Sequence, residues 1–258
     1  MVSELQGAII AAGRGERLRS NGEDIPKPLV RIGGETLLAR QARAMMRVGA
    51  QEVLAIVNSE TAQVIARDRI ELPAHLRLMV RDTASSMESL LALGEELAPG
   101  NFLLTTVDAI IPDGEFAKFI EQACALITNS EVRGFDGVLG VVKWRGDKRP
   151  LFAKIAADHE IVALGDDEAD PRRRRTRGGA QRSRGKVQMV TAGVYLLPAS
   201  IFAFADNARR AQLSALRRFL AMLIDNGLRL GAVELADVID VDEAADLAAA
   251  RVAVEVRR

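Results

Sequence analysis

The feature that most constrains this chain is a short apolar run, residues 8–12, that is followed at once by glycine. An apolar run of this length before glycine is typical of a strand buried inside a parallel sheet. Gly13 and Gly15 come next, and glycines let the backbone approach a ligand closely. Successive N–H groups in such a loop can bind an anion. The first residues therefore predict a buried strand that leads into an anion-binding loop.

Two basic side chains follow this loop. Arg17 carries a planar, permanently charged guanidinium group that suits phosphate. Lys27 stands between Pro26 and Pro28, which restrict the backbone on both sides, so we expect it on a stiff segment. A glycine pair after a strand is most often a plain turn, and a proline-flanked lysine is most often a surface turn. The two features in this order favour a polyphosphate site.

The spacing of these residues resembles the N-terminal signature of the sugar-phosphate nucleotidyltransferases, also called NDP-sugar pyrophosphorylases: Gly13-x-Gly15-x-Arg17-Leu18, then Pro26-Lys27-Pro28-Leu29. It is most similar to the branch of small, single-domain members. That branch includes uridylyltransferases for sugar 1-phosphates and cytidylyltransferases for phosphocholine or inositol phosphate. The resemblance implies a Mg²⁺-dependent enzyme that joins a nucleoside triphosphate, with CTP or UTP favoured, to a phosphorylated small molecule and releases pyrophosphate.

Length and composition agree with one globular domain over residues 1–258. The 258 residues suffice for a large α/β core. Lys and Arg total 35 and balance 35 Asp and Glu, so no overall field favours nucleic acid. No apolar stretch approaches the roughly 20 residues of a membrane span, and no secretion signal is evident, so we expect a cytoplasmic protein without a membrane partner. The single cysteine, Cys124, excludes an internal disulfide, and its apolar surroundings predict a small core residue.

Strand and helix patterns alternate through the nucleotide-binding half, residues 1–143. We expect strands at 52–57, 76–80, 102–107 and 137–142, and helices at 36–48, 61–70, 86–97 and 115–126. This alternation predicts an α/β fold with a doubly wound, mostly parallel, Rossmann-like sheet that is covered on both faces. Ligands of such sheets bind beyond the carboxyl ends of the strands, where Gly13 and Asp108 fall.

The acceptor-binding half, residues 144–258, is richer in strands. We expect strands at 150–156, 160–164, 187–197 and 231–235, and helices at 200–204, 211–225 and 243–254. The helix at 211–225 could pack on the core or on another subunit, so a homodimer is possible. Residues 165–186 are acidic and then arginine-rich, which predicts a mobile loop. The loop is either solvated and without a role, a lid near the phosphates, or a partner contact. It has no interleaved aromatic residues for stacking RNA bases.

Three aspartates are candidate metal ligands. Asp108 follows an apolar strand, where a carboxylate commonly binds Mg²⁺, although it could instead cap the next helix. The resemblance implies that the first metal ligand ends this strand and that the second lies just before the last helix. Asp240 resembles a family pattern in which the aspartate lies three residues before a helix-opening threonine, although Glu243 replaces that threonine here. Asp242 resembles the pattern of the small cytidylyltransferases and could equally be an N-cap. We favour Asp240.

The remaining site residues come from the resemblance. It implies catalytic roles for Arg17 and Lys27, nucleotide contacts from Ala11, Ala12, Gly13, Arg14, Gly15, Glu16, Ser86 and Ser89, and acceptor contacts from Lys154, Thr191 and Gly193. Two alternatives stay open. Ser85 or Ser86 could be an ordinary N-cap, and Lys154 could be an ordinary lysine on an exposed strand.

Rival functions fit the sequence less well. A dinucleotide-binding dehydrogenase needs a third glycine where Leu18 stands, and a Walker loop needs a Gly-Lys-Ser or Gly-Lys-Thr sequence. A metal-dependent glycosyltransferase of related fold remains an alternative, because Asp240-x-Asp242 mimics its metal motif. A non-catalytic nucleotide sensor or regulatory subunit is the other alternative, although Arg17, Lys27 and Asp108 argue against it.

Overall fold

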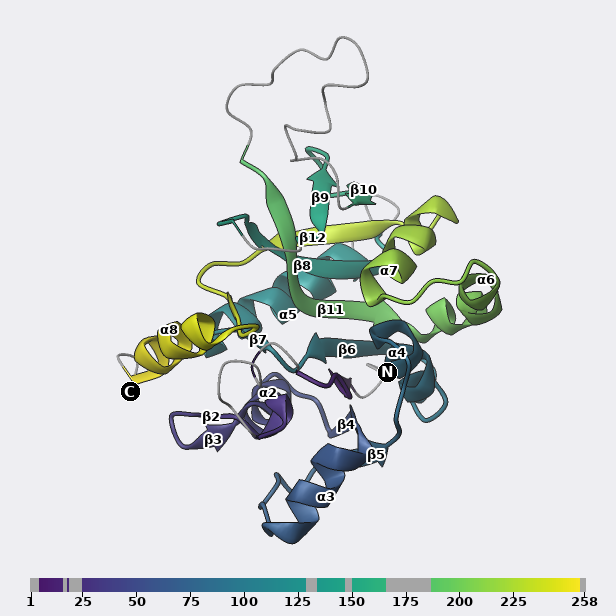
Figure 1. Ribbon diagram of the computed structural model, residues 1–258. Helices are drawn as coiled ribbons and strands as arrows, with labels where there is room; N and C mark the ends of the chain where they lie inside the picture. Colours follow the sequence, from purple (N-terminus) through teal and green to yellow (C-terminus); the bar gives the residue numbers. More distant parts are fainter. Residues whose placement is uncertain are drawn as a thin grey trace, which may run out of the picture.

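A nine-stranded sheet forms the centre of the protein (Figure 1). The computed structural model describes residues 5–15, 18, 25–128, 134–146, 150–165 and 187–255. Seven strands follow the order β10-β9-β11-β6-β1-β4-β5, while β8 also pairs with β11, and β12 pairs with β8. The strands are β1 (Gln6–Ala11), β4 (Glu52–Val57), β5 (Leu76–Val80), β6 (Asn101–Thr106), β8 (Gly137–Lys143), β9 (Phe152–Ile155), β10 (Ile161–Gly165), β11 (Met189–Pro198) and β12 (Leu230–Glu234).

The sheet is mostly parallel, as the alternating sequence pattern predicted. Strand β1 pairs in parallel with β4 and β6, and β4 pairs in parallel with β5. Strand β12 is parallel to β8. Strand β11 runs antiparallel to β6, β8 and β9, and β10 is antiparallel to β9. Among these nine strands only β10 and β11 therefore run against the others, and the predicted fold class is confirmed.

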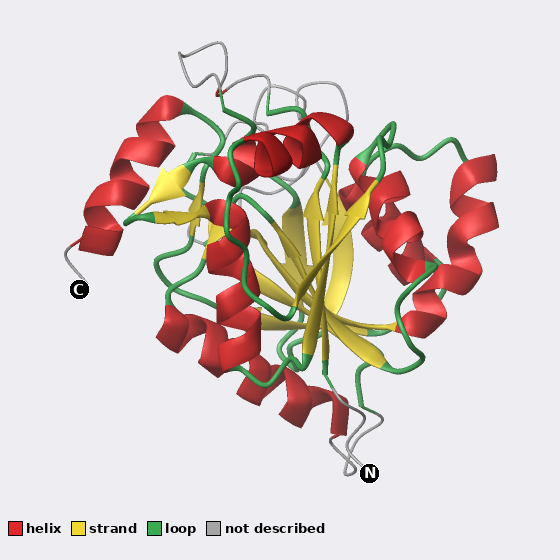
Figure 2. Cartoon of the chain, turned by 90° about the horizontal axis from the view of Figure 1, so that it is seen from below, coloured by secondary structure: helices red, strands yellow, loops and turns green. Residues whose placement is uncertain are grey.

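Helices cover both faces of the sheet (Figure 2). Buried side chains of α2, α5 and α8 join one core cluster, and those of α4, α6, α7 and the 3₁₀ helix η3 join the other. The helices are α2 (Leu37–Arg47), α3 (Ser59–Arg67), α4 (Ser86–Gly94), α5 (Asp113–Thr128), η3 (Ala199–Phe204), α6 (Ala205–Arg210), α7 (Leu216–Asp225) and α8 (Ala244–Glu255). Strand β1 contributes to both clusters, since Ile9 and Ala11 face one and Ala8 and Ile10 face the other.

Two short ribbons were not predicted. Strands β2 (Arg31–Ile32) and β3 (Glu35–Thr36) form a hairpin, and β7 (Ala109–Ile110) pairs antiparallel with β13 (Ile239–Asp240). A two-residue strand is too short to show a hydrophobic period. The β7–β13 ribbon nevertheless brings a segment near the C-terminus against the end of β6, which determines where Asp240 lies.

The predicted helix at 211–225 is wrong at its start, because α7 begins only at Leu216. Helix α6 ends at Arg210. Beyond it, Gln212 adopts the left-handed region at φ 55°, and the Leu213 amide donates a hydrogen bond to the Ala208 carbonyl. The start of α7 is then set by a distant side chain, since Ser86 Oγ accepts a hydrogen bond from the Leu216 amide at 3.0 Å. Leu216 and the buried face of α7 pack on the core.

The prediction that Cys124 is a core residue is also wrong. Cys124 lies on α5 and is exposed, while its neighbour Ala123 is fully buried. The helix places consecutive residues about 100° apart, so only one of the two can face the sheet. Desolvation by its partial burial still raises the pKa of the Cys124 thiol. Of the loop predicted at 165–186, Gly165 ends β10, and residues 166–186 lie outside the described residues.

None of the helices in the described part of the chain has the length and apolar character that a membrane-spanning helix requires.

Candidate active site

The carboxyl ends of β1, β4 and β6 meet at one edge of the sheet, and a cavity of about 1100 Å³ opens there. The loop after β1, the residue after β4 and the turn after β6 each contribute to its wall, as expected for a parallel sheet. Its lining comprises Ile10, Ala12, Gly13, Arg14, Gly15, Lys27, Asn58, Ser59, Glu60, Gln63, Asp82, Thr83, Ala84, Ser85, Ser86, Ser89, Thr106, Val107, Asp108 and Asp242.

The glycine loop is fixed from two sides. Gly15 has φ +63°, and a Cβ atom placed on it would lie 2.8 Å from Lys27 Cβ. Asn58 lies directly after β4, donates from Nδ2 to the Ala12 carbonyl at 3.3 Å and caps α3 by accepting from the Thr61 amide. The loop is thus held against both Lys27 and α3. A glycine is required at position 15 for the backbone conformation and for the close packing of Lys27.

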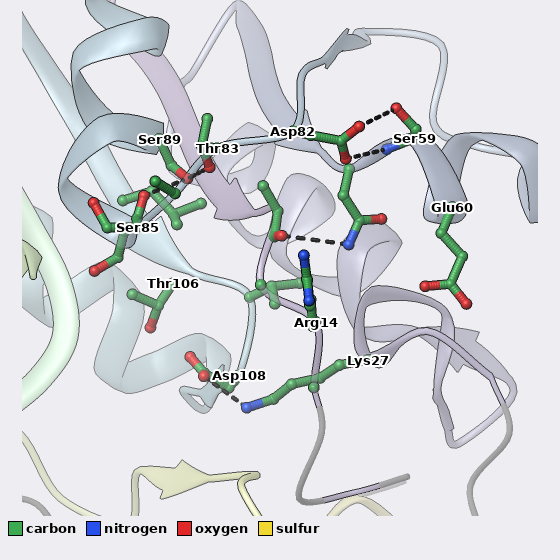
Figure 3. A pocket seen from close by; sticks show the side chains of 18 of the residues that line it. Arg14, Lys27, Ser59, Glu60, Asp82, Thr83, Ser85, Ser89, Thr106 and Asp108 are labelled. Carbon is green, nitrogen blue, oxygen red and sulfur yellow. Dashed lines mark hydrogen bonds and ion pairs between the residues drawn. The ribbon is translucent and has the colours of Figure 1, made fainter. Parts of the chain in front are cut away.

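Lys27 is a buried residue of the cavity wall. It begins a 3₁₀ turn, η1 (Lys27–Leu29), and only 9% of its surface is exposed. Its Nζ atom lies 2.8 Å from Asp108 Oδ2 and 2.9 Å from Asp242 Oδ1 (Figure 3 draws the Asp108 contact). Burial alone would lower the pKa of Lys27, but the two carboxylates outweigh it, so the pKa is raised and the ammonium stays charged.

Three carboxylates converge beside this ammonium. Asp108 follows β6, Asp240 belongs to β13, and Asp242 comes two residues later; one oxygen of each lies within 4.8 Å of the others. The Val241 amide donates to the Asp108 carbonyl at 3.0 Å and holds the two segments together. Hard oxygen donors gathered from separate segments suit a divalent cation such as Mg²⁺. The sequence left a choice between Asp240 and Asp242, whereas the structure brings both to the cluster.

Hydroxyl side chains at the start of α4 line the far wall of the cavity (Figure 3). Ser85 Oγ caps the helix by accepting from the Glu88 amide at 3.2 Å. Ser89 Oγ donates to the Ser85 carbonyl at 3.1 Å and also lies 2.6 Å from Thr83 Oγ1. Because the Ser89 proton is used on Ser85, Thr83 donates in the second contact. Thr83 therefore offers only lone pairs to the cavity.

Asp82 links the same wall to α3. It accepts hydrogen bonds from the Ser59 amide at 3.0 Å and from Ser59 Oγ at 2.5 Å. These hydrogen bonds, with a smaller contribution from the charge of Arg14, lower the pKa of Asp82. The carboxylate is thus ionised and fixed in place, and it faces the cavity that Arg14 also lines.

A second cavity, of about 330 Å³, adjoins the carboxylate cluster. Thr106 lines both cavities, Asp108 and Asp242 line the first, and Asp240 lines the second. Gly193 has φ +73°, and a Cβ there would meet Ala109 and Thr106 within 2.8 Å. The remaining lining is Ala109, Val142, Lys143, Arg145, Thr191, Ala192, Gly193, Glu234, Leu235, Ala236, Asp237, Val238, Ile239 and Asp246.

Comparison with known families agrees with this architecture. Residues 7–181 match the model of the MobA-like NTP transferase domain, and this range covers more than half of the chain. The chain belongs to this family. The family consists of nucleotidyltransferases, so the resemblance inferred from the glycine and proline motifs is confirmed. A search of curated protein sequences finds no match.

Solved structures share the fold of this MobA-like NTP transferase domain. The inositol-1-phosphate CTP transferase from T. maritima is 17% identical, with a TM-score of 0.71 over 99% of this chain and 98% of that one. The CTP:phosphocholine cytidylyltransferase from Streptococcus pneumoniae is 18% identical, with a TM-score of 0.69 over 97% and 99%. The UTP-bound UGPase from Acinetobacter baumannii is 13% identical, with a TM-score of 0.71 over 98% and 94%. Identities this low show a common fold.

The structure brings most of the predicted site residues of this transferase domain together. The large cavity contains Ala12, Gly13, Arg14, Gly15, Lys27, Ser86, Ser89, Asp108 and Asp242, and the smaller one contains Thr191, Gly193 and Asp240. Ser86 also has a structural role, because its hydroxyl accepts a hydrogen bond from the Leu216 amide at the start of α7. Glu16 and Arg17 lie outside the described residues.

Two predicted residues line neither cavity. The Ala11 side chain packs into the core on the face of β1 opposite Ala8 and Ile10, so any contact with a base would have to come from its backbone. Lys154 is exposed on β9 and is absent from the wall of the second cavity. The cavity instead receives its positive charge from Lys143 and Arg145, at and beyond the end of β8.

Sequence reasoning missed several residues of the cavity walls. Asn58 could have been found, because it directly follows an apolar strand and so lies at the same edge as Gly13 and Asp108. Thr106 is the last residue of β6 and precedes Asp108 by two residues. Glu234 and Asp237 carried no local signal, because only the pairing of β12 with β8 places them beside this site.

The geometry of the glycine loop gives a prediction about stability. Gly15→Ala would put a side chain into the left-handed region and against Lys27, and we expect it to destabilise the fold by about 1–2 kcal/mol. Gly13→Ala is the matched control, since a Cβ there meets nothing within 4 Å. Thermal unfolding of both variants measures the difference. Equal melting temperatures for the two variants would contradict this account of the loop.

Proposed function

We propose that this protein is a Mg²⁺-dependent nucleotidyltransferase that joins a nucleoside triphosphate, CTP or UTP, to a phosphorylated small molecule such as a sugar 1-phosphate or an inositol- or choline-type phosphate. Pyrophosphate is the second product. The observation that carries this proposal is the meeting of two cavities at one carboxylate cluster, with Thr106 lining both. Two substrates with phosphate groups can thereby approach one another at a point suited to a divalent cation.

The larger cavity is suited to the triphosphate. Backbone N–H groups at Gly13 to Gly15 and the charge of Arg14 provide an anion-binding loop at the end of β1. The base would lie against Ala12 and the hydroxyl-lined start of α4. Thr83 can accept a hydrogen bond from the exocyclic amino group of cytosine or from N3–H of uracil, because its own proton is used on Ser89.

Mg²⁺ would be held by Asp108 together with Asp240, Asp242 or both, and when bound it neutralises phosphate charge and aligns the two phosphates. Lys27 lies in contact with the same carboxylates and can turn from them to the α-phosphate, where its charge stabilises the transition state. We also keep Arg17 as the expected partner of the leaving pyrophosphate.

The reaction follows from this arrangement. A phosphate oxygen of the acceptor attacks the α-phosphorus in line, a new P–O bond forms, and the bond from the α-phosphorus to the bridging oxygen breaks. Pyrophosphate leaves with that oxygen. No side chain has to form a covalent intermediate, so positioning and charge neutralisation are the contributions of the protein.

The direct test measures pyrophosphate release with Mg²⁺ across the four nucleoside triphosphates and a panel of phosphorylated acceptors, and identifies the products by mass. Pyrophosphate together with a nucleotidylated acceptor is the expected result. A glycosyltransferase would instead release a nucleoside diphosphate from a nucleotide sugar. Nucleotide binding without any turnover would favour a sensor and would overturn the proposal.

Substitution of the proposed catalytic groups tests the same site. Lys27→Ala and Asp108→Asn should each lower turnover by about 100-fold or more, since both groups stabilise charge in the transition state. Arg67→Ala, at the exposed end of α3, and Asp113→Asn, at the exposed start of α5, are the controls. Circular dichroism checks that the variants are folded. Wild-type turnover in both Lys27→Ala and Asp108→Asn would contradict the mechanism.

The contact of Lys27 with the carboxylates predicts competition with a metal ion. Lys27→Met should tighten Mn²⁺ binding in the absence of nucleotide by about tenfold or more, since unit charges 4 Å apart interact by about 4 kcal/mol at an effective dielectric constant of 20. Electron paramagnetic resonance of free Mn²⁺ measures the affinity. Arg67→Met, which removes an exposed charge at the end of α3, serves as the control. Unchanged or weaker Mn²⁺ binding in Lys27→Met would show that the ammonium does not compete for the cluster.

The role of Thr83 gives a prediction about base recognition. Thr83→Val keeps the shape of the side chain but removes the oxygen. We expect KM for the nucleoside triphosphate to rise by about tenfold, because the variant loses one or two hydrogen bonds to the base. Thr83→Ser retains the hydroxyl and should stay close to wild type. The KM for the acceptor should change little in both variants. Equal KM values for Thr83→Val and Thr83→Ser would remove Thr83 from base recognition.

A further inference from the structure

Aromatic side chains are absent from both cavities. The chain has eight Phe, one Trp and one Tyr, and all ten lie in the part of the chain that the structure describes. None of them lines either cavity. The segments outside the described residues contain no Phe, Trp or Tyr, so they cannot supply an aromatic face to the site either.

The aromatic residues are used in the core instead. Phe102 stacks on Phe202 at 5.5 Å, and Trp144 packs edge-on against Phe152 at 5.4 Å. Phe204 packs against the core cluster to which α4 and α7 contribute, and Phe135 lies under the guanidinium of Arg229. Phe116, Phe119 and Phe219 are fully buried.

Tyr195 lies near the smaller cavity, which its partner Thr191 lines. It hydrogen-bonds with Thr191 and is influenced by the charges of Asp108 and Asp240. Only 5% of its surface is exposed, and its ring belongs to the buried core. Burial raises the pKa of Tyr195 far above its ordinary value, so the phenol stays neutral. Its hydroxyl contacts Thr191, while its buried ring lines neither cavity.

The lack of aromatic side chains in the two cavities distinguishes between the classes of acceptor that the proposed function allows. A quaternary ammonium group cannot donate a conventional hydrogen bond and is typically recognised by the faces of aromatic rings. A sugar or cyclitol ring carries hydroxyl groups, each of which donates one hydrogen bond and accepts others. A cavity with carboxylates, hydroxyls and cations but no aromatic face suits the second class.

The smaller cavity offers such groups. Thr106 and Thr191 contribute hydroxyls, and Glu234 and Asp237 contribute carboxylates that can each accept two hydroxyl donors. Lys143 lies 3.4 Å from Glu234, and Arg145 lies 3.9 Å from Asp237. These four charged side chains are more than half exposed, so they can rearrange around a polar ligand.

We propose that the acceptor is a polyhydroxylated phosphate, either a sugar phosphate or a cyclitol phosphate, and not the phosphate of a quaternary ammonium alcohol such as phosphocholine. This inference rests on the proposed nucleotidyltransferase function. Glu234, Asp237 and Thr191 bind the hydroxyl groups of the ring, and the phosphate lies toward Thr106 and Asp240, where the two cavities meet. The cations Lys143 and Arg145 hold the two carboxylates and contact the ring hydroxyls through their outer N–H groups.

The test compares acceptors on the wild-type enzyme. Glucose 1-phosphate, inositol 1-phosphate, glycerol 3-phosphate, phosphocholine and phosphoethanolamine are each supplied with CTP or UTP and Mg²⁺, and pyrophosphate and product mass are measured. We expect kcat/KM for a ring-bearing acceptor to exceed that for phosphocholine by at least about 100-fold, because phosphocholine lacks the hydroxyls that would make two hydrogen bonds to charged groups. The glucose and inositol arms distinguish the two kinds of ring.

The outcomes separate this inference from the function on which it rests. Preferential turnover of phosphocholine or phosphoethanolamine would overturn the acceptor class and leave the nucleotidyltransferase intact. A lack of pyrophosphate with every acceptor would count against the proposed function itself, and the inference would fall with it.

Two variants test the assigned residues. Glu234→Gln and Thr191→Val should each raise KM for the preferred acceptor by about tenfold, because the first weakens and the second removes hydrogen bonds to the ring. KM for the nucleoside triphosphate should stay within about twofold, because neither residue lines the larger cavity. Glu121→Gln, on the exposed side of α5, is the control. Glu234 is largely exposed, so its variant should fold even if Thr191→Val disturbs Tyr195. An unchanged acceptor KM in both variants would overturn the assignment.

Discussion

The contact of the buried Lys27 ammonium with two carboxylates joins three distant segments of this chain. Lys27 comes from the N-terminal loop, Asp108 from the end of the central strand β6, and Asp242 from just before the last helix. These positions are 81 and 215 residues apart along the chain. A charged group with so little exposure is stable only beside opposite charges, and a carboxylate cluster without a cation would repel itself. Each group therefore requires the others.

The sheet makes this meeting possible. Parallel strands β1, β4 and β6 deliver the glycine loop, Asn58 and Asp108 to one edge, because all three end in the same direction. Strand β11 runs the other way beside β6 and has an irregular register around Gly193, whose lack of a side chain leaves room for Thr106 and Ala109. The short β7–β13 ribbon then brings Asp240 to the same place. Two cavities with a common wall at the carboxylates follow from this topology.

Short sequence patterns were sufficient to predict the features that a few neighbouring residues determine. The apolar run before Gly13, the Pro-Lys-Pro segment and the strand before Asp108 each carried a signal in a few neighbouring residues, and the structure places all three in one cavity. These patterns failed where a tertiary contact determines a helix boundary or the exposure of a side chain. The start of α7 depends on the Ser86 hydroxyl 130 residues away, and Cys124 is exposed because its neighbour Ala123 takes the core-facing position.

The sequence by itself determined the alternating α/β fold, the glycine loop and the identity of the charged groups, because buried strands, glycine loops and proline-braced lysines each have a signature within a short segment. The tertiary structure alone decided that Asp240 and Asp242 both join Asp108, that Lys154 stays away from the site, and that Lys143 and Glu234 line it. The physical reason is that side chains from β8, β12 and β13 become neighbours only through strand pairing, and pairing between distant segments leaves no periodic trace in the sequence.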